Sequence, residues 1–313
     1  MHFECNIQER FIVVLMSNAG GAFTISSLII DRLSACDQPA KVHVKTWEDE
    51  TVSYETLNFE VADGVATITL NRPENANALT KRMGEELFDV ANTCDWQKDI
   101  RAVIVTATGK MFCAGGDLKE FNAQGQDIAA FLTATATPLH MAITRFQRMD
   151  APVVMAVNGT AAGAGFSLAL SGDFVMAVPE AKFVSAYTAS GLTPDGSSTY
   201  FLAKHVGLMR AKELVLTNRT LSAEEAQQWG IVSRVVPADD LMAEAGKLAA
   251  SFAAGPTKAY GGSKRLLLTA FNAALETQLE DETVSIAQTS RTEDGRHGID
   301  AFANRNKPTF KGQ

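Results

Sequence analysis

Two glycine-rich turns, each set between an apolar run and a helix-like segment, constrain the fold of this chain most strongly. They cover residues 113–117 (CAGGD) and 159–165 (GTAAGAG), after the β-like runs 102–105 and 152–157. Glycine and alanine let a ligand approach the main chain, and the start of a helix adds a positive field. Two backbone N–H groups from such turns can bind one oxyanion and so stabilise an enolate beside a carbonyl. Packing and turn geometry are the alternative explanation for each turn taken alone.

The order of the elements around these turns favours an α/β fold. Residues 59–62 and 65–70 flank Asp63-Gly64 and predict a hairpin, because β-branched residues alternate on both sides of a turn dipeptide. Apolar residues at helical spacing predict a helix after Leu79-Thr80, and a strand is expected at 102–106. The same order of strand, loop and helix recurs at 152–171, and 174–178 begins another layer.

The two ends of the chain differ from this alternating pattern. After Ser197 the chain is expected to be mainly helical, with a capping box at 222–225 and helices over 238–254 and 256–278. Residues 1–51 contain an apolar run, 11–16, that is too short to span a membrane. We interpret 1–51 as an extension, 52–255 as the catalytic core and 256–313 as a C-terminal helical region.

Composition narrows the class of partner. The chain has 313 residues and is 46% apolar, so it can bury a large core. A net charge of −8 argues against a nucleic-acid partner, because phosphate contacts need a basic face. The four cysteines show no metal-like spacing, so we expect no metal site and reduced thiols in a cytoplasmic protein. Because the apolar run at 11–16 is too short to span a membrane, we also expect no membrane association.

Three stretches carry a specific resemblance. Residues 109–121 (GKMFCAGGDLKEF), 156–165 (AVNGTAAGAG) and 70–79 (LNRPENANAL) are similar to the crotonase, or enoyl-CoA hydratase/isomerase, superfamily, and the match continues through 216–226 and 229–232. The resemblance implies a spiral of repeated ββα units and a C-terminal helical trimerisation region, hence a homotrimer or a homohexamer. It also implies an acyl-CoA thioester as substrate, with no other cofactor. The thioester carbonyl would lie between the N–H groups of Gly116 and Ala164.

The acid and base positions depart from the water-adding branch of that superfamily. Its two glutamates correspond to Ser167 and Tyr187, neither of which is a carboxylate, and this argues against simple hydration. Asp195 resembles instead the carboxylate of members that shift double bonds or displace an aromatic halide. Its local sequence is also typical of an N-cap or turn aspartate. In an apolar acyl pocket its pKa is expected to rise toward a useful value for a general base.

His140 resembles the histidine that acts as a base in the aryl-CoA dehalogenase branch, although a histidine on such a helix is often only a packed core residue. That branch has tryptophan where Tyr187 stands, and the tyrosine hydroxyl is a candidate substrate hydrogen bond. For the coenzyme, the resemblance points to Arg72 near the nucleotide phosphates and to the carbonyl of Ala114 for the adenine amine. Lys307 and Lys311 in the tail are further phosphate candidates, with solvated surface roles as the alternative.

The residues and the resemblance together predict an acyl-CoA isomerase that moves a double bond by proton transfer through a thioester enolate. The stretch 187–199 resembles most the ring-epoxide isomerases of phenylacetyl-CoA breakdown. The alternatives are an aryl-CoA dehalogenase with Asp195 as nucleophile and His140 as base, an enoyl-CoA hydratase, and a catalytically silent acyl-CoA-binding protein.

Overall fold

The computed structural model describes residues 10–19, 22–31, 44–45 and 53–313, and the chain divides into two compact units, Met1–Ser53 and Tyr54–Gln313. In the first unit, β1 (Arg10–Ala19), β2 (Ala22–Asp31) and β3 (Val44–Lys45) form an antiparallel sheet in that order. No strand is predicted here from the sequence, although Gly-Gly at 20–21 between two apolar runs is a hairpin signal.

The second unit is built on two sheets, whose strand orders are β13-β10-β8-β6-β5-β4 and β12-β11-β9-β7. In the larger sheet β4 and β5 are antiparallel and the remaining neighbours are parallel. Its strands are β4 (Leu57–Ala62), β5 (Val65–Leu70), β6 (Ala102–Ala107), β8 (Val153–Val157), β10 (Phe174–Ala177) and β13 (Arg234–Val235). Those of the smaller sheet are β7 (Met111–Cys113), β9 (Thr160–Ala162), β11 (Lys182–Val184) and β12 (Leu221–Ser222).

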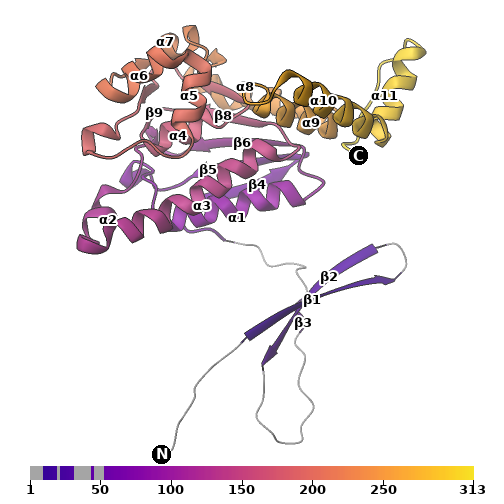
Figure 1. Cartoon of the computed structure of the whole chain (residues 1–313), viewed down its shortest axis with the longest axis horizontal. Helices are drawn as coiled ribbons and strands as arrows, with labels where there is room; N and C mark the ends of the chain where they lie inside the picture. The colour runs from indigo at the N-terminus through magenta and orange to yellow at the C-terminus, as the bar shows by residue number, and fades with distance from the viewer. Residues whose placement is uncertain (1–9, 20–21, 32–43, 46–52) are drawn as a thin grey trace, which may run out of the picture. The chain divides into compact units, whose positions relative to one another are not determined.

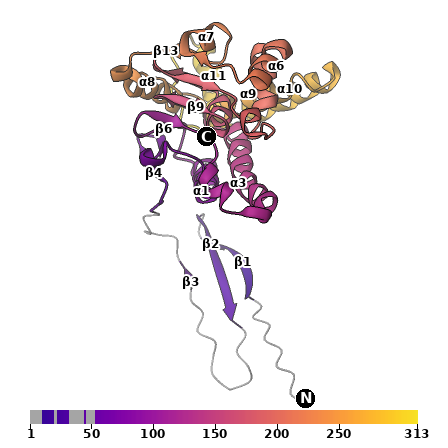
Figure 2. The same cartoon turned by 90° about the vertical axis from the view of Figure 1, so that its left-hand side faces the viewer.

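Local signals explain several of these elements. Asp63 and Gly64 both have positive φ, 51° and 78°, as a tight turn between right-twisted strands requires, so the predicted hairpin is confirmed. The predicted helix after Thr80 is α1 (Lys81–Trp96), whose Thr80 side chain accepts from the Met83 N–H. α1 lies beside the long helix α3 (Ile128–Arg148) in both views (Figures 1 and 2).

The remaining helices complete the alternating architecture. The Ser222 side chain accepts from the Glu225 N–H, which confirms the predicted helix start there. The α-helices between the strands are α2 (Leu118–Asn122), α4 (Ala164–Leu170), α5 (Ser198–Val206), α6 (Leu208–Thr217) and α7 (Ala223–Gln228). Short 3₁₀ turns are η1 (Pro73–Asn75), η2 (Gly125–Asp127), η3 (Thr188–Ser190) and η4 (Ala238–Asp240).

The C-terminal part is helical, as expected, but its boundaries differ from the prediction. It consists of α8 (Leu241–Ala253), α9 (Thr257–Thr269), α10 (Leu275–Ser290) and α11 (Glu293–Ala303), so the single helix predicted over 256–278 is wrong. The Thr269 carbonyl accepts from the N–H groups of Asn272 and Ala273, which closes a turn. The Asn272 amide then donates to the Tyr200 hydroxyl, 3.2 Å away. Among the helices of the described residues, none is long and apolar enough to cross a membrane.

A buried ion pair joins the C-terminal helices to the larger sheet. Lys264 Nζ on α9 lies 2.6 Å from Asp173 Oδ2, and the two side chains are only 9% and 17% exposed. Lys264 also donates to the carbonyls of Phe146 and Ala151, and Asp173 accepts from the Val153 N–H. Burial raises the pKa of Asp173, an effect that Lys264 only partly offsets, and burial lowers the pKa of Lys264.

We expect Lys264→Met to lower the free energy of unfolding by about 3 kcal/mol near neutral pH, because it leaves the Asp173 carboxylate buried without its cation. The loss should shrink at acidic pH, since a carboxyl with a raised pKa then takes up a proton and becomes neutral. The matched control is Lys258→Met on the same helix, where the lysine is 49% exposed. Urea unfolding at both pH values measures the effect, and equal losses for the two variants would contradict it.

Candidate active site

The two glycine-rich turns lie side by side at the ends of β7 and β9, which pair in parallel. The first turn is held by hydrogen bonds from the Leu79 N–H to the Gly115 carbonyl and from the Asp117 N–H to the Leu79 carbonyl. In the second turn Ala164 is the first residue of α4. Within the described part of the chain, neither the Gly116 N–H nor the Ala164 N–H has a hydrogen-bond acceptor. Two main-chain donors are therefore free at neighbouring strand-to-helix junctions.

Glycine is required at two positions of the second turn. Gly163 has φ of 50° and ψ of −124°, a backbone conformation that side chains disfavour. A Cβ on Gly165 would lie 2.4 Å from the carbonyl oxygen of Cys113, so only glycine lets α4 approach the end of β7 this closely. These contacts place Ala164 next to the first turn.

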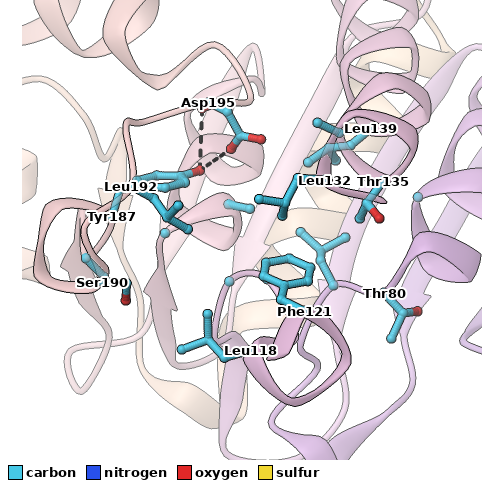
Figure 3. A pocket seen from close by; sticks show the side chains of 18 of the residues that line it. Thr80, Leu118, Phe121, Leu132, Thr135, Leu139, Tyr187, Ser190, Leu192 and Asp195 are labelled. Carbon is cyan, nitrogen blue, oxygen red and sulfur yellow. Dashed lines mark hydrogen bonds between the residues drawn. The ribbon is translucent and has the colours of Figure 1, made fainter. Parts of the chain in front are cut away.

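A cavity of about 370 Å³ opens between the two turns, α3 and the segment 186–195. Gly116, Ala164 and Ala114 are among the residues that line it, and Asp195 is the one carboxylate among its described lining residues. Figure 3 shows Tyr187 and Asp195 on one side and the α3 residues on the other, with apolar side chains converging between them. Those apolar residues include Leu118, Phe121, Leu132, Leu139 and Leu192. Such a lining suits an acyl group.

Asp195 belongs to a hydrogen-bonded network with Tyr187 and Ser167. The Tyr187 hydroxyl donates to Asp195 Oδ1 over 2.6 Å and lies 2.9 Å from Ser167 Oγ. Ser167 Oγ donates to the Asp195 main-chain carbonyl over 2.8 Å. Burial and the neighbouring Asp195 charge raise the pKa of Tyr187 far above its usual range, so its hydroxyl remains a donor. The three positions compared in the sequence thus meet in space.

The environment of Asp195 corrects two expectations. Its carboxylate caps no helix, because the N-cap of α5 is Ser197, which makes no capping bond, and only the Asp195 carbonyl accepts from the Ser198 N–H. The predicted rise in its pKa is also wrong. Burial raises the pKa of Asp195, but the contacts that its carboxylate makes with His140 and Tyr187 outweigh burial and hold that pKa below its usual value.

His140 lies on α3 and reaches the turn that carries Asp195. Its Nε2 accepts from the Gly196 N–H over 3.0 Å and is 3.5 Å from Asp195 Oδ2. The imidazole is 48% exposed, so it is not the packed core histidine of the alternative interpretation. It touches the carboxylate but does not line the cavity.

The second unit has clear relatives among known proteins. Residues 60–313 match the sequence model of a family described as enoyl-CoA hydratase/isomerase. The chain belongs to this family. It is 37% identical over 263 residues to 1,2-epoxyphenylacetyl-CoA isomerase of Escherichia coli, covering 83% of this chain and 99% of that protein. It is 36% identical over 262 residues to a probable enoyl-CoA hydratase of Rhodobacter capsulatus, and the match covers 84% of this chain and 100% of that protein.

Solved structures place the fold in the same enoyl-CoA hydratase/isomerase family. The crystal structure of a putative enoyl-CoA hydratase/isomerase from Mycobacterium abscessus superposes with a TM-score of 0.77 at 34% identity, covering 82% of this chain and 100% of that one. The second unit therefore has the crotonase fold, a mixed α/β spiral followed by C-terminal helices, as the resemblance implied.

The residues expected from the sequence to bind coenzyme A are not all gathered at the cavity. Ala114 lines it, but Arg72 does not, and its guanidinium donates to the Ala78 carbonyl and to Asp117 Oδ2. Asp117 in turn caps α2 by accepting from the N–H groups of residues 119 and 120. Lys307 and Lys311 are exposed in the tail after α11. The described residues contain no group of three or more side chains able to hold a metal ion.

Two contributions to the site are not predicted from the sequence. Ser167, which the sequence excludes only as a carboxylate, donates to the Asp195 main-chain carbonyl and lies 2.9 Å from the Tyr187 hydroxyl. Its position directly after the second glycine turn is the signal that indicates such a role. Leu132 and Leu139 on α3 line the cavity, and their helical spacing is the corresponding signal.

Proposed function

We propose that this enzyme is an acyl-CoA isomerase that moves a double bond by proton transfer through a thioester enolate. The observation that carries the proposal is that one carboxylate, Asp195, lines an apolar cavity beside the free N–H groups of Gly116 and Ala164. Two main-chain donors to a thioester oxygen stabilise the negative charge that develops when a neighbouring C–H loses its proton. A single base then suffices to remove a proton from one carbon and return it to another.

The network around Asp195 supports this role. Tyr187 holds Oδ1 by a short hydrogen bond, which fixes the carboxylate toward the cavity (Figure 3). Because the pKa of Asp195 lies below its usual value, the carboxylate is ionised and ready to accept a proton at neutral pH. A weak base of this kind depends strongly on enolate stabilisation by the Gly116 and Ala164 donors.

Ser167 and Tyr187 argue against hydration in the same site. Two carboxylates would share the activation of water and the delivery of a proton, but these positions carry two hydroxyls, which lie 2.9 Å apart. The proximity of His140 Nε2 to Asp195 favours a second candidate, an aryl-CoA dehalogenase in which Asp195 is the nucleophile. Halide release and a trapped aspartyl ester would identify that reaction, and an isomerase produces neither.

The deciding experiment is a turnover screen with a small panel of 3-enoyl-CoA and aryl-CoA substrates, followed by solvent deuterium incorporation and double-bond position. We expect exchange and double-bond migration on an enoyl-CoA. Normal binding of acyl-CoA with neither proton exchange nor halide release on any member of the panel would identify a catalytically silent binding protein instead.

For the coenzyme we propose the assignments that the resemblance implied. The carbonyl of Ala114, a residue of the cavity wall, would accept a hydrogen bond from the adenine amine. The basic groups of Arg72 and Lys307 would bind the phosphates. The guanidinium of Arg72 also donates to the Ala78 carbonyl and to Asp117, and these bonds hold it next to the first glycine turn.

We expect the protein to sediment as a trimer or a dimer of trimers. Its C-terminal helices expose large apolar side chains, and such surfaces mark contacts between subunits. These residues are Leu267, Phe271, Leu275, Leu279, Ile286, Ile299 and Phe302. Sedimentation velocity measures the state, and a stable monomer at micromolar concentration would contradict the expectation.

A further inference from the structure

The turn that carries Asp195 has an unusual backbone and is held from several sides. Gly196 and Ser197 both have positive φ, 58° and 72°, which is costly for the serine. The Asp195 carbonyl accepts from Ser167 Oγ and from the Ser198 N–H. The Gly196 N–H has one acceptor in the described chain, Nε2 of His140. His140 is therefore the side chain that anchors the middle of this turn.

One nitrogen of His140 faces two different groups. To accept from the Gly196 N–H, Nε2 must present its lone pair, so the imidazole is neutral with its proton on Nδ1. Asp195 Oδ2 lies 3.5 Å from the same nitrogen and attracts a proton placed there. Nε2 cannot accept from Gly196 and donate to Asp195 at once. The hydrogen bond that the structure shows is the one from Gly196, so His140 acts on the turn as an acceptor.

The charged groups around His140 leave Asp195 as its partner. The elements packed against α3 are α1, α2, η2 and α9. No ion pair or hydrogen bond in the described residues joins His140 to their charged side chains, which are Lys81, Arg82, Glu85, Glu86, Asp89, Asp95, Lys119, Glu120, Asp127, Lys258, Lys264 and Arg265. Tyr187 is the other titratable side chain that bonds Asp195.

We propose that His140 is a positioning residue of the isomerase: its Nε2 accepts from the Gly196 N–H, anchors the Asp195–Gly196 turn and so holds the Asp195 carboxylate at the cavity. Without this acceptor the middle of the turn loses its side-chain anchor on α3, and the carboxylate leaves the position from which it takes the substrate's proton. The inference rests on the proposed function, because it concerns the position of Asp195 as the base of that reaction.

This role predicts a loss of turnover rather than of binding. His140 does not line the cavity, so its replacement should lower kcat for isomerisation while the affinity for an unreactive acyl-CoA changes by less than about threefold.

Two substitutions separate anchoring from the mere bulk of the side chain. Gln can place an acceptor oxygen near the position of Nε2, so His140→Gln should lose less than about threefold in kcat. His140→Phe has no acceptor and should lose about tenfold or more, because the turn is displaced. Met141→Gln, on the exposed neighbouring residue, is the control for the helix surface and should behave like the unmodified enzyme.

The experiment is the rate of solvent deuterium exchange on a 3-enoyl-CoA for these variants and for Asp195→Asn. Equal losses for His140→Gln and His140→Phe, or an unchanged rate in His140→Phe, would overturn the positioning role. Retention of activity in Asp195→Asn would overturn the proposed function instead, so the two failures are distinct. Binding of an unreactive acyl-CoA by each variant reports that the fold is kept.

Discussion

Asp195→Asn should lower the rate of double-bond migration by about a hundredfold or more while acyl-CoA affinity changes by less than about tenfold. Asparagine keeps the size of the side chain and an oxygen that accepts from Tyr187, but it cannot accept a proton from carbon. The thioester donors of Gly116 and Ala164 are untouched, so binding persists. The measurement is solvent deuterium incorporation and double-bond shift on a 3-enoyl-CoA, alongside binding of an unreactive acyl-CoA.

Ser167→Ala is the comparison for that experiment. It removes the hydroxyl that bonds the Asp195 carbonyl but leaves the carboxylate in place, so its loss should be much milder. If Asp195→Asn keeps most of the rate, the base is another group, and Tyr187 and His140 are the next residues to replace.

Ala164→Pro should lower kcat/KM by about a hundredfold to a thousandfold, the cost of removing one donor to a developing oxyanion. Proline has no N–H, and it is tolerated at the first position of a helix, where Ala164 stands. The preceding Gly163 has no Cβ to clash with the proline ring. The substitution therefore removes the donor without removing a hydrogen bond of α4.

The chain offers a matched control for the backbone change. Leu208 is the first residue of α6, also follows a glycine, and does not line the cavity. Leu208→Pro should keep wild-type turnover, and thermal unfolding of both variants reports their stability. Equal turnover of Ala164→Pro and Leu208→Pro would show that the Ala164 N–H does not act on the thioester.

Elements set by neighbouring residues were predictable from the sequence. The hairpin at Asp63-Gly64 and the start of α1 at Thr80 depend on contacts within a few residues, and both predictions are confirmed. The break between α9 and α10 was not predictable, because residues 270–274 contain no glycine or proline. The Asn272 amide donates there to the hydroxyl of Tyr200, which belongs to another helix, α5. Tertiary contacts override a helical pattern there.

In the candidate site, too, the locally determined features were predictable from the sequence and those that depend on tertiary contacts were not. The residues of the two glycine turns could be named from the sequence because backbone chemistry needs small side chains at fixed spacing. The direction of the pKa shift of Asp195 could not be predicted from the sequence, because it depends on Tyr187 and His140. His140 lies 55 positions before Asp195 in the chain and reaches the carboxylate only in the folded protein. Burial alone would have shifted that pKa the other way.

The buried pair of Lys264 and Asp173 has a consequence for how the protein is made. Asp173 leaves the ribosome long before Lys264, because Lys264 lies 91 positions later in the chain (264 − 173 = 91). Until α9 has been synthesised, the Asp173 carboxylate next to β10 has no cation to pair with. Folding of the core is therefore completed only after translation has nearly ended, and a chain cut short before α9 is a substrate for chaperones and proteases.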